Sequence, residues 1–95
     1  MRETKDNPNQ INVELIVRSD CGFCDRINDE LIQMNLHFPE MCIATKHISE
    51  IGNEKRPMGG ITPSIWVNGE LWFLGSFDNE IFQNRIQVLA TKLAD

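Results

Sequence analysis

Two cysteines separated by two residues are the part of this 95-residue sequence with the clearest chemical potential. Cys21 and Cys24 follow an apolar run at residues 11–17 and open a segment with helical periodicity. At a helix start, free backbone N–H groups and the positive end of the helix dipole stabilise a thiolate. We therefore expect the pKa of Cys21 to lie below the value of about 8.5 of a free thiol. Cys21 would then attack a disulfide, and Cys24 would resolve the resulting mixed disulfide.

A metal site and a pair of inert thiols are the alternatives for these cysteines. Cys42 and His47 complete a set that resembles zinc ligands. If residues 41–48 form a strand, however, two residues an odd number apart project to opposite faces and cannot both bind one ion. We therefore predict no metal site, and we expect Cys42 to be a small core residue.

Composition excludes several classes of protein. Hydrophobic residues make up 41% of the chain and charged residues 24%, with a net charge of −5, which is typical of a globular domain without a membrane span. The basic residues are scattered, which argues against nucleic acid or an anionic membrane as a partner. Residues 1–10 are polar and lack the apolar run of a signal peptide, and the cysteine count is odd, so we expect a cytoplasmic protein.

The remaining pattern predicts one small domain at residues 11–95 behind a loose lead-in at residues 1–10. Apolar, β-branched runs predict strands at residues 11–17 and 41–48, and apolar residues at helical spacing predict a helix that ends near Asn35. A short helix is expected to open near Ser49.

The C-terminal part of the chain predicts a hairpin and a closing helix. Asn68-Gly69 suits a type I′ turn between two strands, across which Trp66 and Trp72 are expected to face each other. Asp78 is the expected N-cap of the last helix. The predicted order is β-α-β-(short α)-β-β-α, an α/β fold with a four-stranded mixed sheet and helices packed on it.

Thr62-Pro63, directly before the first strand of the hairpin, is the second feature with a functional interpretation. Proline is tolerated at the first residue of a strand, where its missing N–H does no harm. Alternatively, a cis Thr62–Pro63 bond holds the Thr62 backbone beside the sulfurs, where it can pair with the backbone of a bound substrate.

These features together resemble the thioredoxin-like superfamily, and its glutaredoxins more than its thioredoxins. The resemblance covers about residues 11–93 and rests on Cys21-x-x-Cys24, on Thr62-Pro63, and on residues 74–78, which are similar to the Gly-Gly-x-Asp element of glutaredoxins. It implies a thioredoxin-like fold and a thiol–disulfide oxidoreductase with no tightly bound cofactor. Cys21 would be the attacking thiol and Cys24 the resolving thiol.

The resemblance also implies substrate contacts. Arg18 stands where glutaredoxins usually place a Lys that meets a carboxylate of glutathione, and Asp78 matches the acidic residue that meets its amino group. Glutathione is thus a candidate co-substrate, and glutathione or a reductase would be the electron donor for disulfides of proteins or small thiols. The predicted substrate-binding residues are Arg18, Phe23, Thr62, Pro63, Gly75 and Asp78.

Departures from both subfamilies leave the subfamily open. Asp20 replaces the Trp that precedes the thioredoxin dithiol, Leu15 stands where thioredoxins carry a buried acid, and Ser76 replaces the second Gly of glutaredoxins. Cys-Gly-Phe is also similar to monothiol glutaredoxins that hold an iron–sulfur cluster, although their last motif residue is Ser. A cluster- or metal-binding module and a non-catalytic interaction domain therefore remain the alternative functions.

Overall fold

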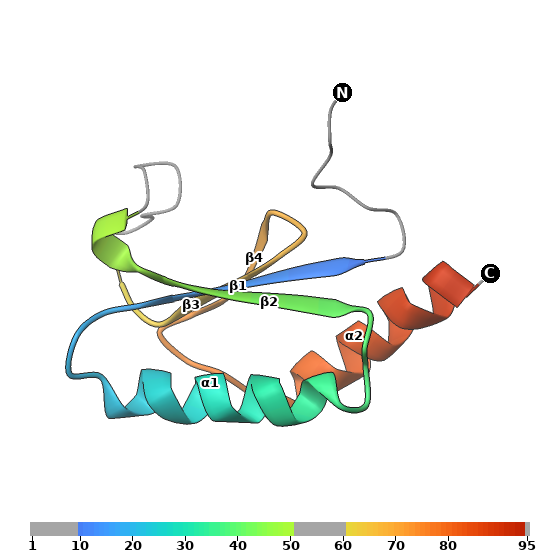
Figure 1. Ribbon diagram of the computed structural model, residues 1–95, viewed down its shortest axis with the longest axis horizontal. Helices are drawn as coiled ribbons and strands as arrows, with labels where there is room; N and C mark the ends of the chain where they lie inside the picture. Colours follow the sequence, from blue (N-terminus) through green and yellow to red (C-terminus); the bar gives the residue numbers. More distant parts are fainter. Residues whose placement is uncertain (1–9, 51–60, 95) are drawn as a thin grey trace.

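The described part of the chain forms a four-stranded mixed sheet with two helices on one face (Figure 1). The computed structural model describes residues 10–50 and 61–94. The strand order is β2-β1-β3-β4, so β2 and β4 are the edges of the described sheet. The predicted α/β class, element order and four-stranded mixed sheet are confirmed.

The N-terminal half is a β-α-β unit that brings the dithiol to one end of the sheet. Strand β1 (Ile11–Val17) leads into helix α1 (Gly22–Asn35), and β2 (Met41–His47) returns parallel to β1. Burial alternates along β1 as far as Leu15, because one face of the strand packs against the helices, and Ile16 is buried as well. These bounds agree with the predicted strands and helix to within one residue at the end of β2.

The C-terminal half begins with the predicted hairpin, β3 (Ser64–Val67) and β4 (Glu70–Leu74). Asn68 and Gly69 have φ angles of 52° and 84°, the two positive values that a type I′ turn requires. The register shifts between Ile65 and Trp66, so that Trp66 pairs with Leu71. The expectation that Trp66 faces Trp72 is therefore wrong.

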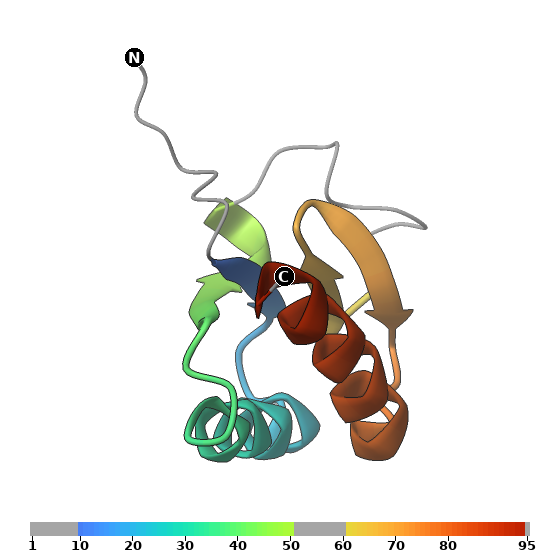
Figure 2. The ribbon, with the colours of Figure 1, turned by 90° about the vertical axis from the view of Figure 1, so that its right-hand side faces the viewer.

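Helix α2 (Asn79–Ala94) closes the fold, and both views place it on the same side of the sheet as α1 (Figures 1 and 2). The side chain of Asn79 donates to Glu30 Oε1 at 2.7 Å, which joins the start of α2 to α1. The core lies between the sheet and these helices and includes the following fully buried residues: Val13, Leu15, Ile27, Leu31, Ile65, Phe82 and Ile86.

Cys42 corrects one sequence prediction, because its side chain is exposed and not part of the core. Met41 and Ile43 pack against the core, so Cys42 between them points to the other face of the sheet. It does so on an edge strand, where an apolar sequence alone does not ensure burial.

Two further expectations concern the ends of the described segments. The short helix begins as a 3₁₀ turn, η1 (Ile48–Glu50), and its predicted continuation lies outside the described residues. The predicted lead-in at residues 1–10 also lies outside them, except for Gln10.

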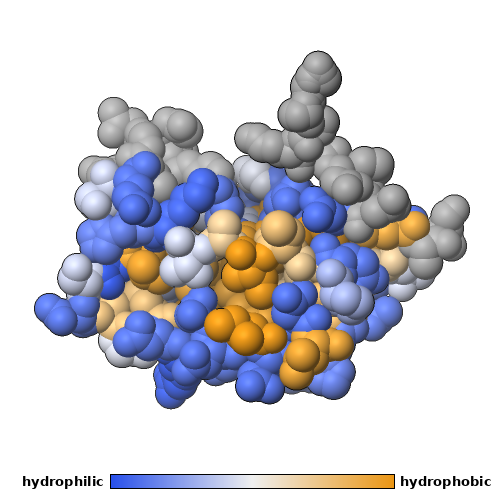
Figure 3. Space-filling model, viewed as in Figure 1, coloured by the Kyte–Doolittle hydropathy of each residue, from blue (hydrophilic) through white to orange (hydrophobic). Residues whose placement is uncertain are grey.

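No helix within residues 10–50 and 61–94 is long and apolar enough to cross a membrane. On the face seen in Figure 3, hydrophobic side chains form small groups among hydrophilic ones.

Candidate active site at the start of helix α1

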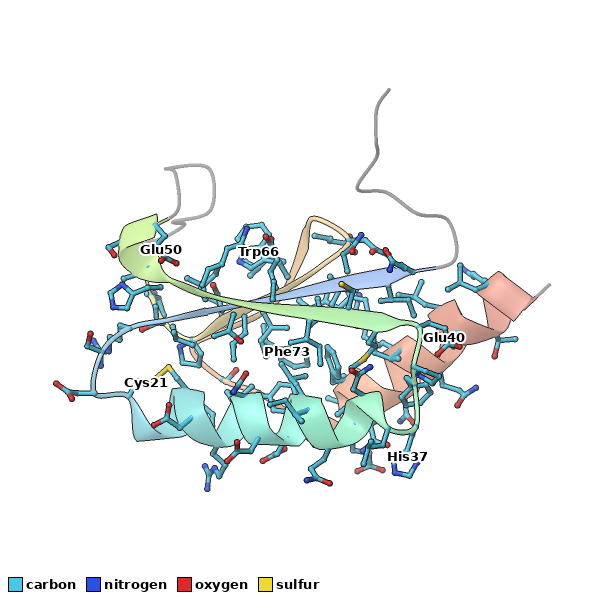
Figure 4. The ribbon with its side chains drawn as sticks, in the orientation of Figure 1. Cys21, His37, Glu40, Glu50, Trp66 and Phe73 are labelled. Carbon is cyan, nitrogen blue, oxygen red and sulfur yellow. A yellow bond between two sulfur atoms is a disulfide. The ribbon has the colours of Figure 1, made fainter. Side chains whose placement is uncertain are left out.

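Cys21 and Cys24 form a disulfide at the N-terminal end of α1, where the chain leaves the sheet (Figure 4). Their Cα atoms are 5.2 Å apart. The two cysteines differ in exposure: Cys21 is partly exposed, whereas Cys24 is only 1% exposed. Among the described residues, a Cβ atom added at Gly22 would meet no atom within 4 Å. The described part of the chain therefore leaves the disulfide open on the side of Cys21.

The backbone around Cys21 directs its sulfur at the helix amides. Cys21 is the N-cap of α1, and its Sγ accepts a hydrogen bond of 3.1 Å from the backbone N–H of Cys24. Asp20, directly before it, has a φ of 57°, in the left-handed region that Asp and Asn adopt more readily than most residues. In the reduced protein, the same amide would stabilise a Cys21 thiolate and lower the pKa of this thiol.

Thr62 and Pro63 lie at the end of the sheet that carries the dithiol. Ile16 pairs with Ser64, so Pro63 enters β3 beside the point where β1 leads toward Cys21. The Thr62–Pro63 peptide bond is cis. The Thr62 Oγ1 atom is buried and has no hydrogen-bond partner within residues 10–50 and 61–94.

Gly75 connects the end of β4 to this proline. Its N–H donates to the carbonyl oxygen of Pro63 at 2.7 Å, and its φ is 75°. A Cβ atom at this position would lie 3.2 Å from Ile61 Cγ2, which is closer than most Cβ contacts. The positive φ favours glycine at this position, and a side chain there would also require Ile61 to shift.

Phe23, Arg18 and Asp78 occupy different environments near the two helix starts. Phe23 is half-buried against the core, and the Arg26 guanidinium lies 5.4 Å from its ring centroid. Arg18 is exposed in the connection between β1 and α1. Asp78 Oδ1 accepts a hydrogen bond of 3.0 Å from the N–H of Ile81, as predicted for an N-cap. The contacts of Arg18 and Asp78 with glutathione and of Phe23 with a substrate stay predictions.

His47 is a residue whose position sequence reasoning missed. Its ring lies between two serines: Nε2 is 3.2 Å from Ser19 Oγ and Nδ1 is 2.9 Å from Ser49 Oγ. Ser49 is close in sequence and could have been found there. Ser19 is 28 residues away and is brought to His47 by the parallel pairing of β1 with β2.

The cysteines of the dithiol do not come together with Cys42 and His47 as a set of zinc ligands. Cys42 and His47 pair with Asn12 and Val17, at opposite ends of the ladder between β1 and β2. Within residues 10–50 and 61–94, no group of three His, Cys, Asp or Glu side chains is placed to hold a metal ion.

Comparisons with known proteins identify the fold. No protein-family model matches the chain. No curated protein matches it either. Among solved structures, it is similar to oxidised mitochondrial thioredoxin 3 from Saccharomyces cerevisiae, with a TM-score of 0.64, 16% identity and coverage of 84% of this chain and 79% of that one.

Two further solved structures give the same result. Oxidised thioredoxin O2 from Arabidopsis thaliana has a TM-score of 0.64 and 15% identity, with coverage of 86% of this chain and 76% of that one. A thioredoxin-like protein from Bacillus cereus has a TM-score of 0.60 and 14% identity, with coverage of 85% and 90%. At such identities the likeness concerns the fold, and the closer resemblance to glutaredoxins stays a prediction. The chain therefore has the thioredoxin-like fold, with its Cys21–Cys24 disulfide at the start of the first helix.

Proposed function

We propose that this protein is a thiol–disulfide oxidoreductase that uses Cys21 and Cys24 to reduce disulfides. The observation that carries the proposal is the disulfide at the N-terminus of α1, with one sulfur facing the helix amides from a partly exposed residue and the other buried. Exposure and amide contact are what an attacking thiolate needs. The names of the structural relatives, two of them thioredoxins, support the same chemistry.

The proposed reaction has two exchange steps. The Cys21 thiolate attacks one sulfur of a substrate disulfide, forms a mixed disulfide and releases the other substrate sulfur as a thiolate, which takes a proton from water. Cys24 then loses its proton and attacks Cys21 Sγ, which forms the Cys21–Cys24 disulfide and releases the second substrate thiolate. The protein dithiol thus loses two electrons and the substrate disulfide gains them.

The buried residue Leu15 bears on the proton that Cys24 must lose. Leu15 lies six residues before Cys21, is fully buried in the core, and carries no ionisable group. A buried carboxylate at that position cannot therefore take the proton in this chain. We assign the proton to water, because the departing substrate thiolate becomes a base only when the mixed disulfide breaks, after Cys24 has attacked.

Glutathione and a protein reductase are the two candidate electron donors. Arg18 is exposed beside the dithiol connection, and Asp78 keeps a carboxylate at the start of α2. A cation and an anion at these places would suit the carboxylate and the amino group of glutathione. We propose glutathione as the co-substrate on this ground and on the resemblance to glutaredoxins, with disulfides of proteins or small thiols as substrates.

A coupled assay tests the function and the donor together. Hydroxyethyl disulfide is offered with NADPH and either glutathione plus glutathione reductase or thioredoxin reductase alone, and NADPH consumption is measured. Cys42→Ser is the matched control, because it removes a thiol outside the disulfide, and it should turn over like the unmodified protein. We expect turnover with glutathione. Turnover only with thioredoxin reductase would overturn the proposal that glutathione is the electron donor. No turnover with either system would overturn the proposed oxidoreductase function.

The cluster-binding alternative predicts a different observation. Protein purified without oxygen would then absorb visible light and contain iron in a fixed ratio to the chain. Under the present proposal, the same sample is colourless, and a mild oxidant converts two of its three thiols, those of Cys21 and Cys24, to one disulfide.

A further inference from the structure

The connection between β1 and α1 must hold Cys21 in place although its residues are exposed. Arg18, Ser19 and Asp20 are all on the surface, and Asp20 has the positive φ that turns the chain into the helix. In the disulfide form, the bond to Cys24 also restrains Cys21. Reduction removes that bond, so the position of Cys21 Sγ then depends on how the connection itself is held.

His47 holds this connection from the neighbouring strand. His47 is the last residue of β2, and its Nε2 lies 3.2 Å from the hydroxyl oxygen of Ser19, two residues before Cys21. Its own backbone N–H donates to Glu50 Oε1 at 3.0 Å, at the end of η1. Figure 4 shows Cys21 and Glu50 at the same end of the molecule. His47 is therefore bonded to η1 through its backbone and to the connection before α1 through its ring.

The hydrogen bonds assign the protonation of the ring. The backbone N–H of Ser49 donates to His47 Nδ1 at 3.1 Å, so this nitrogen is an acceptor and carries no proton. A neutral imidazole then has its proton on Nε2, and Nε2–H donates to Ser19 Oγ. The ring cannot rotate to another arrangement without losing the bonds to Ser49.

We propose that His47 is a positioning residue for Cys21 that acts through Ser19. This inference rests on the proposed function, because it concerns the reactivity of the attacking thiol. The Nε2–H donor fixes Ser19, which keeps Asp20 in its left-handed conformation and Cys21 Sγ against the Cys24 amide. Losing the bond lets the connection move, so the amide stabilises the thiolate less of the time.

A double-mutant cycle on reduced protein tests the proposal. Cys24→Ser with Cys42→Ser leaves Cys21 as the single thiol, and its rate of reaction with iodoacetamide at neutral pH is measured in four forms: unchanged, Ser19→Ala, His47→Ala and both. We expect each single change to slow the reaction roughly two- to fivefold, the effect of one exposed hydrogen bond. The double change should slow it no further. Additive effects, or no effect of either change, would overturn the proposal.

Conservative substitutions separate positioning from a general structural role. In His47→Gln the amide nitrogen takes the place of Nε2 and can donate to Ser19, whereas in His47→Asn it takes the place of Nδ1. We expect Gln to restore the rate and Asn to resemble Ala, while the unfolding free energies of the Gln and Asn variants stay close. Equal rates for Gln and Asn would contradict a role for the Nε2 donor.

The dithiol–disulfide equilibrium with glutathione gives an independent readout in the Cys42→Ser protein. Ser19→Ala should shift its constant two- to fivefold toward the disulfide, because the reduced form loses thiolate stabilisation, and an unchanged constant would count against the proposal. The alkylation cycle needs no disulfide substrate. If the protein fails the turnover assay but the effects of Ser19→Ala and His47→Ala on alkylation are not additive, the proposed function is rejected and the positioning role is kept. If the protein turns over but the two effects are additive, the positioning role is rejected and the proposed function is kept.

Discussion

Helices α1 and α2 each begin with a hydrogen bond from a helix N–H to the side chain of the capping residue, but the accepting atom differs. At α1, Cys21 Sγ accepts from the N–H of Cys24 at 3.1 Å, and at α2, Asp78 Oδ1 accepts from the N–H of Ile81 at 3.0 Å. A carboxylate oxygen keeps its negative charge at neutral pH, whereas the sulfur is uncharged in the disulfide and becomes an anion only after reduction. The charge of the cap of α2 is therefore constant at neutral pH, whereas the charge of the cap of α1 depends on the redox state of Cys21.

The start of α2 is also more firmly packed than the start of α1. Asp78 is followed by Phe82, which is fully buried among the rings of Trp72, Phe73 and Phe77. Cys21 is preceded by three exposed residues that a hydrogen bond to His47 joins to β2. Aromatic packing anchors one helix start, while the other keeps one sulfur accessible at the surface. Four experiments test this difference.

Replacing the sulfurs of α1 should have the largest effect, the loss of turnover. Serine also caps helices well, so Cys21→Ser removes the nucleophile while keeping an acceptor for the Cys24 amide. We expect Cys21→Ser to form no mixed disulfide and Cys24→Ser to form one that persists, both read by mass spectrometry after one turnover. The unfolding free energy of each variant is compared with that of the reduced parent. Equal loss of the mixed disulfide in both variants would contradict the assigned roles.

Phe82→Ala should be the most destabilising change at the start of α2. Removing a fully buried aromatic ring costs about 3–5 kcal/mol, through lost burial and the cavity left behind. Ile81→Ala is the matched control, because Ile81 is its neighbour in the helix but 50% exposed, and it should cost less than about 0.5 kcal/mol. Urea unfolding gives both values. A similar cost for the two would show that the outer side of α2 is also packed.

Asp78→Ala should weaken the cap of α2 without affecting the dithiol. The expected loss is about 1 kcal/mol in urea unfolding, while Asp78→Asn, which keeps a capping oxygen, should cost only a few tenths of that. Asp78→Asn also removes the charge proposed to meet the amino group of glutathione. It should therefore raise the KM for glutathione and leave kcat unchanged. An unchanged KM would limit Asp78 to capping.

The smallest expected effect is a difference in alkylation rate between two cysteines. We expect the Cys24 amide to lower the pKa of reduced Cys21, whereas Cys42 is exposed on β2 and caps no helix. Each unit of lowering raises the thiolate fraction tenfold at pH 6 but reduces nucleophilicity, which leaves a gain of roughly threefold per unit. Mass spectrometry at each cysteine measures the rates. Folded protein should favour Cys21 and protein in urea should not, and equal rates in both states would mean that α1 does not activate its sulfur.

Local features of this fold were predictable because neighbouring residues determine them. The Asn68-Gly69 turn needs two positive φ angles that these residues tolerate, and helix α1 follows from apolar residues three or four apart. The exposure of Cys42 was not predictable in this way. Its apolar neighbours indicate a strand, but only the order of strands in the sheet shows that this strand lies at an edge.

Residues within one turn of chain account for the dithiol, its place before α1 and the Asp78 cap of α2. The groups that surround the dithiol depend instead on how the strands pair. Ser64 meets Ile16, and His47 meets Ser19, because the strands pair in one register among several that a short apolar strand allows. That register is set by the total burial of the core, a sum over the whole fold that no local pattern contains.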